Sequence, residues 1–269
     1  MRVDALGDFS IEIDWEFLKR NARESVEGTH KEWVKPLSEA APLLVPIEVV
    51  APPIPLDRLE QLDHMVAALR EAGAQGTDES LIAAYGVHIN PEVPAATPEV
   101  IHRYLRAFAL LQWWLMDAHD LDPMRRITPY INPWPEAYLL EVLSLIAPGA
   151  GQLIDSYLAH NPTRNRALDM LPLFAHIDAA RVQRAVDDPR VKSRPTFHYR
   201  LPNCRIEQSD WSLARSWHLW CTVETLAWDD AALDGLSAEF LAAQRPLIGV
   251  AHAAWIETVS QWLADRGLA

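Results

Sequence analysis

Alternation of apolar and polar residues predicts four short extended strands. The first runs over residues 9–15, where every second residue is apolar and the residues between are Ser, Glu and Asp. The second, 43–50, stops at the proline-rich segment that follows it, because successive prolines cannot donate to a ladder. The same period of two recurs at 85–90 and at 196–201. We therefore expect strands at both the start of the chain and well past its middle.

Helical periodicity dominates the rest of the chain. An apolar stripe from Leu59 to Leu69 precedes Gly73, which suits a left-handed C-terminal cap. Thr97-Pro98 supplies an N-cap and a first-turn proline for a long apolar helix. Further helices are predicted at 135–147, 151–159, 165–176, 178–187, 211–228 and 237–265. This order of elements predicts an α+β protein with long helical segments in its middle and C-terminal parts.

A single domain over 1–269 is the simplest organisation, because the sequence has no internal repeat, low-complexity segment or flexible linker. Its 24 basic against 37 acidic residues give a formal charge of −13, which argues against nucleic acid as a partner. Cys204 and Cys221 are too few for a disulfide framework. No segment resembles a signal peptide or a membrane span, so we expect a cytoplasmic protein without a membrane partner.

The polar faces of the four predicted strands carry residues capable of chemistry. These are Glu12 with Asp14, Glu48, His88 with Asn90, and His198 with Arg200. A half-solvated antiparallel sheet would alternate in the same way without any site. However, carboxylates with His and Asn are hard ligands suited to Mg²⁺ or Mn²⁺, and an arginine on the same surface could hold phosphate oxygens or a carboxylate. A cleft that binds metal and phosphate is the functional interpretation.

Two further polar groups are candidates for anion binding. The turn 160–166 contains Asn161, Arg164 and Asn165 and is predicted to lead into the helix at 165, where arginines would add to the positive end of the helix dipole. A capping loop with solvated arginines is the alternative. Around the last strand lie Arg194, Arg200 and Arg205, which surface ion pairs would also explain. No P-loop, Rossmann fingerprint or nucleophile elbow is present.

Five sequence strings together resemble the putative amidoligase family. They are Leu6-Gly7-Asp8-Phe9 with Glu12-Ile13-Asp14, the segment 45–53 (VPIEVVAPP), the segment 86–90 (GVHIN), the segment 160–166 (HNPTRNR) and the segment 194–205 (RPTFHYRLPNCR). The resemblance runs from residue 6 to about residue 228. It implies a glutamine synthetase-like antiparallel sheet with helices packed on one face, and an ATP- and Mg²⁺-dependent joining of a carboxylate to an amine through an acyl phosphate.

The resemblance also implies roles for individual residues. Glu12 and Glu48 would bind metal, with Asp14 on the same face, and His88 would contact metal or phosphate. Asn90, Asn161, Asn165 and His198 would contact the nucleotide. Arg164, Arg200 and Arg205 would be the catalytic contacts to phosphate or to the substrate carboxylate. The implied substrates are small-molecule or peptide carboxylates and amines, and nothing in the sequence selects among them.

One departure from the family pattern bears on these roles. Family members begin with an additional strand bearing a G-[VI]-E-x-E-type motif and a helix, and this sequence starts at the next strand. We therefore expect an open sheet edge, which a homo-oligomer could cover. Two alternatives stay open beside the ligase: a catalytically dead nucleotide- or peptide-binding relic, and a metal-dependent hydrolase that needs no ATP.

Overall fold

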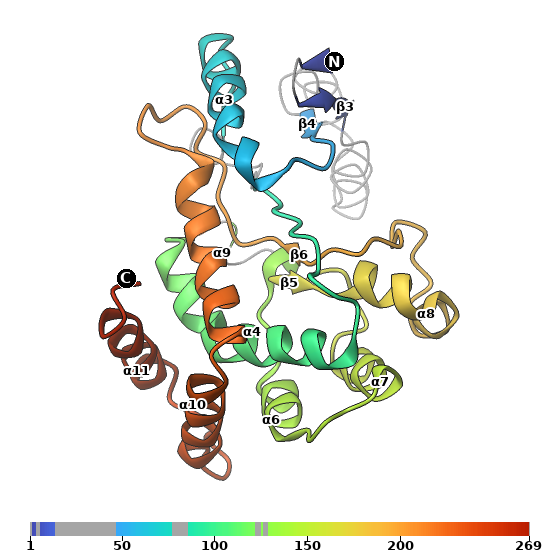
Figure 1. Ribbon diagram of the computed structural model, residues 1–269, viewed down its shortest axis with the longest axis vertical. Helices are drawn as coiled ribbons and strands as arrows, with labels where there is room; N and C mark the ends of the chain where they lie inside the picture. The colour runs from blue at the N-terminus through green and yellow to red at the C-terminus, as the bar shows by residue number, and fades with distance from the viewer. Residues whose placement is uncertain are drawn as a thin grey trace, which may run out of the picture. The chain divides into compact units, whose positions relative to one another are not determined.

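A computed structural model describes residues 2–3, 6–13, 47–76, 86–121, 125 and 129–268 (Figure 1). The predicted α+β class is confirmed, since helices and short antiparallel sheets are both present. The likeness to the glutamine synthetase sheet stays a prediction. The chain divides into two compact units, Met1–Tyr85 with Arg205–Leu213, and Gly86–Cys204 with Ala214–Ala269. The expectation of a single domain stays a prediction.

The first unit contains two antiparallel strand pairs. Strand β1 (Arg2–Val3) pairs with β2 (Gly7–Asp8), and β3 (Ser10–Ile13) pairs with β4 (Ile47–Val50). Both β3 and β4 fall inside segments that alternation predicts as strands, so these two predictions are confirmed for the described residues. The remainder of each predicted segment, 14–15 and 43–46, lies outside them.

A helical segment and its cap complete the first unit. The 3₁₀ helix η1 (Leu56–Gln61) leads into α3 (Leu62–Glu71), and Gly73 follows with φ of 84°, as the predicted left-handed cap requires. Arg70 in α3 donates from Nε to the carbonyl of Ile206 at 2.7 Å and from Nη2 to that of Trp211 at 3.0 Å. The segment 205–213 is therefore bound to α3 although it lies far from it in sequence.

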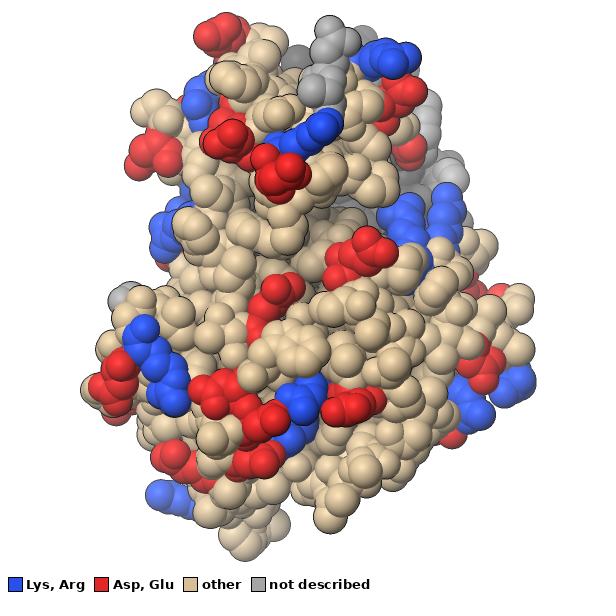
Figure 2. All heavy atoms as spheres, viewed as in Figure 1, with Lys and Arg blue, Asp and Glu red and all other residues tan. Residues whose placement is uncertain are grey.

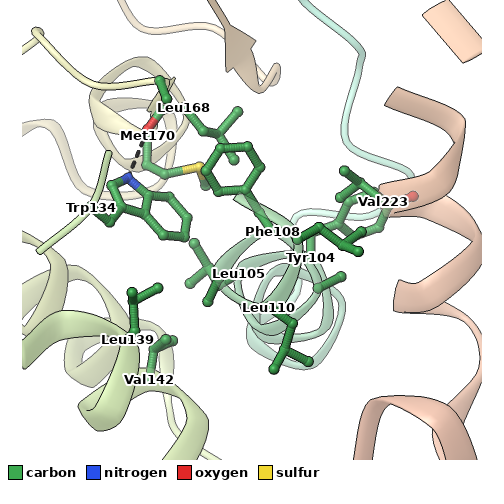
Figure 3. Packing of buried hydrophobic residues seen from close by; sticks show 14 of the residues in the cluster. Tyr104, Leu105, Phe108, Leu110, Trp134, Leu139, Val142, Leu168, Met170 and Val223 are labelled. Carbon is green, nitrogen blue, oxygen red and sulfur yellow. Dashed lines mark hydrogen bonds between the residues drawn. The ribbon is translucent and has the colours of Figure 1, made fainter. Parts of the chain in front are cut away.

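The second unit is built around helix α4 (Pro98–Ala118). The Thr97 hydroxyl accepts a hydrogen bond from the Val100 amide, which confirms the predicted N-cap. Most of α4 is buried on all sides, and Figure 3 shows Leu105 and Phe108 facing Trp134 in the core. The indole of Trp134 also donates to the Leu168 carbonyl at 2.9 Å. The tryptophans of α4, Trp113 and Trp114, are buried, as expected of large aromatic residues.

Further helices surround α4 in the second unit (Figure 1). Helices α6, α7, α10 and α11 all contact α4. Besides α4, the described residues of this unit form η2 (Pro129–Ile131), α6 (Glu136–Ser144), α7 (Ala150–His160), α8 (Leu171–Ala185), α9 (Leu213–Ala227), α10 (Asp230–Ala243) and α11 (His252–Ala264). The predicted helices at 135–147, 151–159 and 211–228 are thereby confirmed, with ends that differ by a few residues.

Two helix predictions are wrong in part. The predicted helix 165–176 begins only at Leu171, because residues 168–169 form strand β5 and pair with β6 (His198–Tyr199). The predicted helix 237–265 is broken between α10 and α11, where Pro246 and the positive φ of Gly249 (77°) form a tight turn. The predicted break near residue 177 is confirmed as a kink at Asp178, whose carboxylate caps the following turn by accepting from the Arg181 amide.

The sheet of the second unit has the segment 195–203 at its centre. On one side lies β5, and the Arg200 amide donates to the Ala167 carbonyl at 2.9 Å. On the other side lies the segment 86–93, where Ile89 and Tyr199 exchange two hydrogen bonds of 2.9 Å. Within the described residues, the predicted strand 85–90 is therefore antiparallel to the predicted strand 196–201, but it contacts that segment through isolated bridges and does not form a continuous strand.

Gly86 marks a place where this sheet tolerates no side chain. A Cβ there would lie 2.6 Å from Nη2 of the buried Arg125 and 3.3 Å from the Pro202 carbonyl. Because that Arg125 nitrogen is bonded to the Arg200 carbonyl, it cannot move without losing the bond. We expect Gly86→Ala to lower the free energy of unfolding by about 1–3 kcal/mol in chemical denaturation. Gly235→Ala, in the interior of α10 with no atom within 4 Å, should instead raise it by about 0.5–1 kcal/mol.

Candidate anion-binding site

Strand alternation gives the central segment of the second unit one apolar face and one polar face. Phe197, Tyr199 and Leu201 are fully buried on the apolar face, so His198 and Arg200 lie on the other. Since Ile89 is the direct partner of Tyr199, its neighbours His88 and Asn90 share the polar face. The four residues that sequence alternation selected in this unit, His88, Asn90, His198 and Arg200, are therefore on one surface.

A carboxylate that the sequence analysis did not select, Asp169, completes this polar face. It is the cross-strand partner of His198, and its Oδ2 lies 2.7 Å from Nη2 of Arg200. Both residues are buried, with exposed fractions of 0% for Asp169 and 8% for Arg200. Burial raises the pKa of the Asp169 carboxyl, while the positive charge of Arg200 and a hydrogen bond from the Leu171 amide oppose this. One carboxylate therefore balances one guanidinium inside the protein.

Positive charge on this face exceeds the charge of Asp169. Arg164, in the turn after α7, lies within electrostatic range of Arg200 and His198, and its pKa is lowered first by burial and then by Arg200. The Nε atoms of Arg164 and Arg200 and the Nε2 atom of His198 are buried without a hydrogen-bond partner among the described residues. Buried donors without partners are costly, so a set of them on one face is typical of a site that a ligand completes. The ligand that suits two guanidinium groups is an oxyanion such as phosphate or carboxylate.

Arg125 supports the end of this sheet and was not selected from the sequence. It donates from Nη1 to the Leu201 carbonyl and to Oδ1 of Asn203, and from Nη2 to the Arg200 carbonyl, at 2.7, 2.9 and 2.7 Å. Asn203 in turn donates to the carbonyls of His119 and Asp120 at the end of α4. Arg125 thus holds the backbone from which the Arg200 side chain extends. The only local signal was a pair of arginines at 125–126 outside any periodic pattern.

The turn 160–166 is held mainly by its own hydrogen bonds. Asn161 is fully buried as the C-cap of α7, and its Oδ1 accepts from Nε of Arg166 at 2.7 Å. The Thr163 hydroxyl accepts from the amide of the half-buried Asn165 at 3.1 Å. Because α8 begins only at Leu171, the expectation that Arg164 and Asn165 lie at a helix N-terminus is wrong. Their assignment as ligand contacts stays a prediction.

The first unit contains the remaining candidates. Glu12 and Glu48 are direct partners across the β3–β4 pair, so their exposed side chains lie on the same face, with Cβ atoms roughly 5 Å apart. The Ser10 hydroxyl donates to Oε1 of Glu12 at 2.9 Å on this face. Arg205 also belongs to this unit, and Asp14 lies outside the described residues.

This carboxylate pair suits Mg²⁺ in its chemistry. Mg²⁺ prefers oxygen ligands and is commonly held by one or two carboxylates together with substrate phosphates and water. Like charges directly opposite each other on a sheet also repel, and a divalent cation relieves that repulsion. Over the ranges that the structure describes, no group of three or more His, Cys, Asp and Glu residues could hold a metal ion. The roles of Glu12, Asp14 and Glu48 as metal ligands stay predictions.

Comparison with models of protein families shows which family the chain belongs to. Residues 1–222 match the model of the family described as "Putative amidoligase enzyme". The chain belongs to this family. The amidoligase match includes both the Glu12–Glu48 pair and the basic face around Arg200, and it ends within α9. Neither a curated protein nor a solved structure matches the chain.

The surface of the protein carries mixed charge. In Figure 2 basic and acidic side chains lie near one another at several places on the face drawn. Within the part of the chain that the structure describes, no helix is both long and apolar enough to cross a bilayer.

His119 contacts the buried side of the sheet in the second unit, and its surroundings lower its pKa. Its Nε2 is hydrogen-bonded to the Tyr199 hydroxyl, and burial followed by the charges of Arg125 and Arg215 lowers its pKa to about 3. The His119 imidazole therefore binds a proton below about pH 6.5 in the unfolded chain but only near pH 3 in the folded protein. As a result, the free energy of unfolding falls as pH drops from about 6.5 toward 3.

We expect His119→Gln to flatten this dependence. Between pH 6 and pH 4.5 the free energy of unfolding should fall less steeply in the variant than in the wild type. The two slopes should differ by roughly 1.4 kcal/mol per pH unit, as measured by urea denaturation at each pH. His176→Gln, at an exposed position of α8, is the matched control and should keep the wild-type slope. Equal slopes for wild type and His119→Gln would contradict the assignment.

Proposed function

We propose that this amidoligase joins a carboxylate to an amine at the expense of ATP, with Mg²⁺ or Mn²⁺, through an acyl phosphate. The observation that carries the proposal is the buried Arg200, whose Nε has no hydrogen-bond partner among the described residues, together with Arg164 and His198 on the polar face of the sheet. Family membership over residues 1–222 supports ligase chemistry for this face. A reaction that consumes ATP would take place in the cytoplasm, and this location is part of the proposal.

In the proposed first step a substrate carboxylate oxygen attacks the γ-phosphorus of ATP and releases ADP. Arg164 and Arg200 hold the transferring phosphoryl group, because guanidinium groups can donate two parallel hydrogen bonds to phosphate oxygens. Asp169 keeps Arg200 in place through the 2.7 Å ion pair. In the first unit, Glu12 and Glu48 would hold Mg²⁺, which when bound would supply positive charge to phosphate oxygens.

In the proposed second step the amine attacks the acyl carbon. The C–O bond to phosphate breaks, the C–N bond forms, and inorganic phosphate and one proton are released. The same arginines stabilise the negative charge on the departing phosphate, because this phosphate is the phosphoryl group that they bind in the first step. His88 and Asn90, exposed on the same face, are placed to contact the nucleotide or the phosphate.

Trapping with hydroxylamine tests the proposed mechanism. A panel of amino acids and short peptides is incubated with Mg-ATP and hydroxylamine, and ADP and hydroxamate are measured together. An acyl phosphate predicts both products in equal amounts, and Arg200→Lys should reduce both, whereas Arg184→Lys at an exposed position of α8 should not. Release of ADP without hydroxamate would contradict the acyl phosphate. Cleavage of amides in the absence of ATP would favour a hydrolase instead.

A further inference from the structure

The imidazole of His198 has a buried nitrogen that nothing in the described structure uses. Its Nε2 is excluded from solvent and has no hydrogen-bond partner among the described residues. His198 lies two residues before Arg200 on the same face of the strand, which separates their Cα atoms by roughly 6.6 Å. This nitrogen therefore belongs to the anion-binding face.

The charges that face His198 come from every neighbouring segment and are mainly positive. Arg200 is on its own strand, Arg194 precedes that strand, and Arg164 is in the turn after α7. His88 interacts with it from the paired segment 86–93. On the other side Asp169 is its cross-strand partner, and that carboxylate is already paired with Arg200.

This environment keeps the imidazole neutral in the unliganded protein. Burial, followed by the charges of Arg200, Arg194 and Arg164, lowers the pKa of His198 to about 3. A bound oxyanion with two negative charges would reverse the sign of the local charge. An oxyanion also offers only acceptors, so the buried nitrogen can bind it only as a donor.

We propose that His198 takes up a proton when a dianionic phosphoryl group binds beside Arg164 and Arg200, so that anion binding and protonation are coupled. The identity of the physiological anion, a nucleotide or acyl phosphate, rests on the proposed function. The coupling itself concerns only side chains of the second unit. By linkage, affinity for the anion then rises as pH falls, by up to about tenfold per pH unit.

Sulfate is the probe that isolates this coupling. It mimics the shape of phosphate and stays a dianion between pH 5 and pH 8, so any pH dependence comes from the protein. We would measure sulfate binding to the full chain by calorimetry at pH 6 in two buffers with different heats of ionisation. The expected result is uptake of close to one proton per sulfate bound, and weaker binding at pH 8.

Variants assign the proton to His198. His198→Gln should still bind sulfate through the arginines but without proton uptake and without pH dependence, whereas His176→Gln, exposed on α8, should behave as wild type. Should His198→Gln fail to fold, NMR of the histidine Cε1 protons of a His88→Gln variant provides the assignment: one imidazole should still become protonated on adding sulfate, and loss of that change would place the proton on His88.

Three results would overturn the proposal. Sulfate binding without proton uptake would mean that His198 donates through a change of tautomer alone. Absence of sulfate binding would mean that the face is not an anion site. Unchanged proton uptake in His198→Gln would mean that another group takes up the proton. The proposed ligase is judged separately by ADP and hydroxamate formation. Proton-coupled sulfate binding in a protein that forms no ADP would refute the ligase and leave this inference standing.

Discussion

Asp169→Asn is expected to lower the free energy of unfolding by about 3–5 kcal/mol, because it leaves the buried Arg200 guanidinium without a counter-charge. Asn is nearly the same size as Asp, so little of this loss comes from packing. Its amide oxygen can still accept from the Leu171 amide, which keeps the turn into α8 capped. The loss therefore reports on the charge of Asp169, and it would be measured by urea denaturation at pH 7.

The control for this substitution is Asp155→Asn. Asp155 pairs with Arg181 at a similar distance, 2.6 Å, but on an exposed surface where both groups remain hydrated. We expect no change beyond experimental error for this variant, because exposed ion pairs contribute little. If Asp169→Asn proved as mild as Asp155→Asn, Arg200 would have to be neutralised or hydrated by another route, and the anion site would lose its basis.

Glu12→Gln is expected to have opposite effects on activity and stability. Loss of one carboxylate from the Glu12–Glu48 pair should reduce Mg-ATP-dependent turnover by about 10²-fold or more, because a metal ion contributes several kcal/mol to stabilising the transition state. The same substitution removes the repulsion between like charges opposite each other on the sheet, so stability should rise by a few tenths of a kcal/mol. The Ser10 hydroxyl can still donate to the Gln side chain.

Asp63→Asn, at an exposed position of α3 in the same unit, is the control variant. It separates the effects of Glu12→Gln on turnover and stability from those of losing any one negative charge. It removes one negative charge from the first turn of α3, so it should leave turnover unchanged and lower stability by about 0.3–1 kcal/mol, opposite in sign to the effect of Glu12→Gln on stability. The two readouts for Glu12→Gln are measured by ADP release over a range of Mg²⁺ concentrations and by urea denaturation. Full turnover in Glu12→Gln would remove Glu12 from the set of metal ligands, whatever its effect on stability.

Much of the local structure could be predicted from the sequence because its signals are local. The N-cap at Thr97, the left-handed cap at Gly73 and the kink at Asp178 each depend on side chains within a few residues. The period of two at 196–201 likewise placed His198 and Arg200 on the face opposite Phe197 and Tyr199. The turn that breaks the predicted helix 237–265 also had a local signal, since Pro246 and Gly249 interrupt its apolar pattern.

Other features had no such signal because they depend on residues far apart in the chain. Residues 165–170 have a composition compatible with helix, and strand β5 forms only because β6 lies beside it. Arg125 became a support of the sheet through hydrogen bonds to residues 75 to 78 positions away. No period or cap in the sequence indicates contacts of this kind.

The sequence by itself determined the types and order of most elements, the choice of polar residues on each strand and, through its strings, membership in the amidoligase family. Only the tertiary structure decided that Asp169 and Arg200, 31 positions apart, form a buried ion pair, and that His198 and Arg164 share its surroundings. The physical reason is that alternation depends on backbone geometry within one segment. Burial, pairing and the field at a side chain depend instead on which segments the fold brings together.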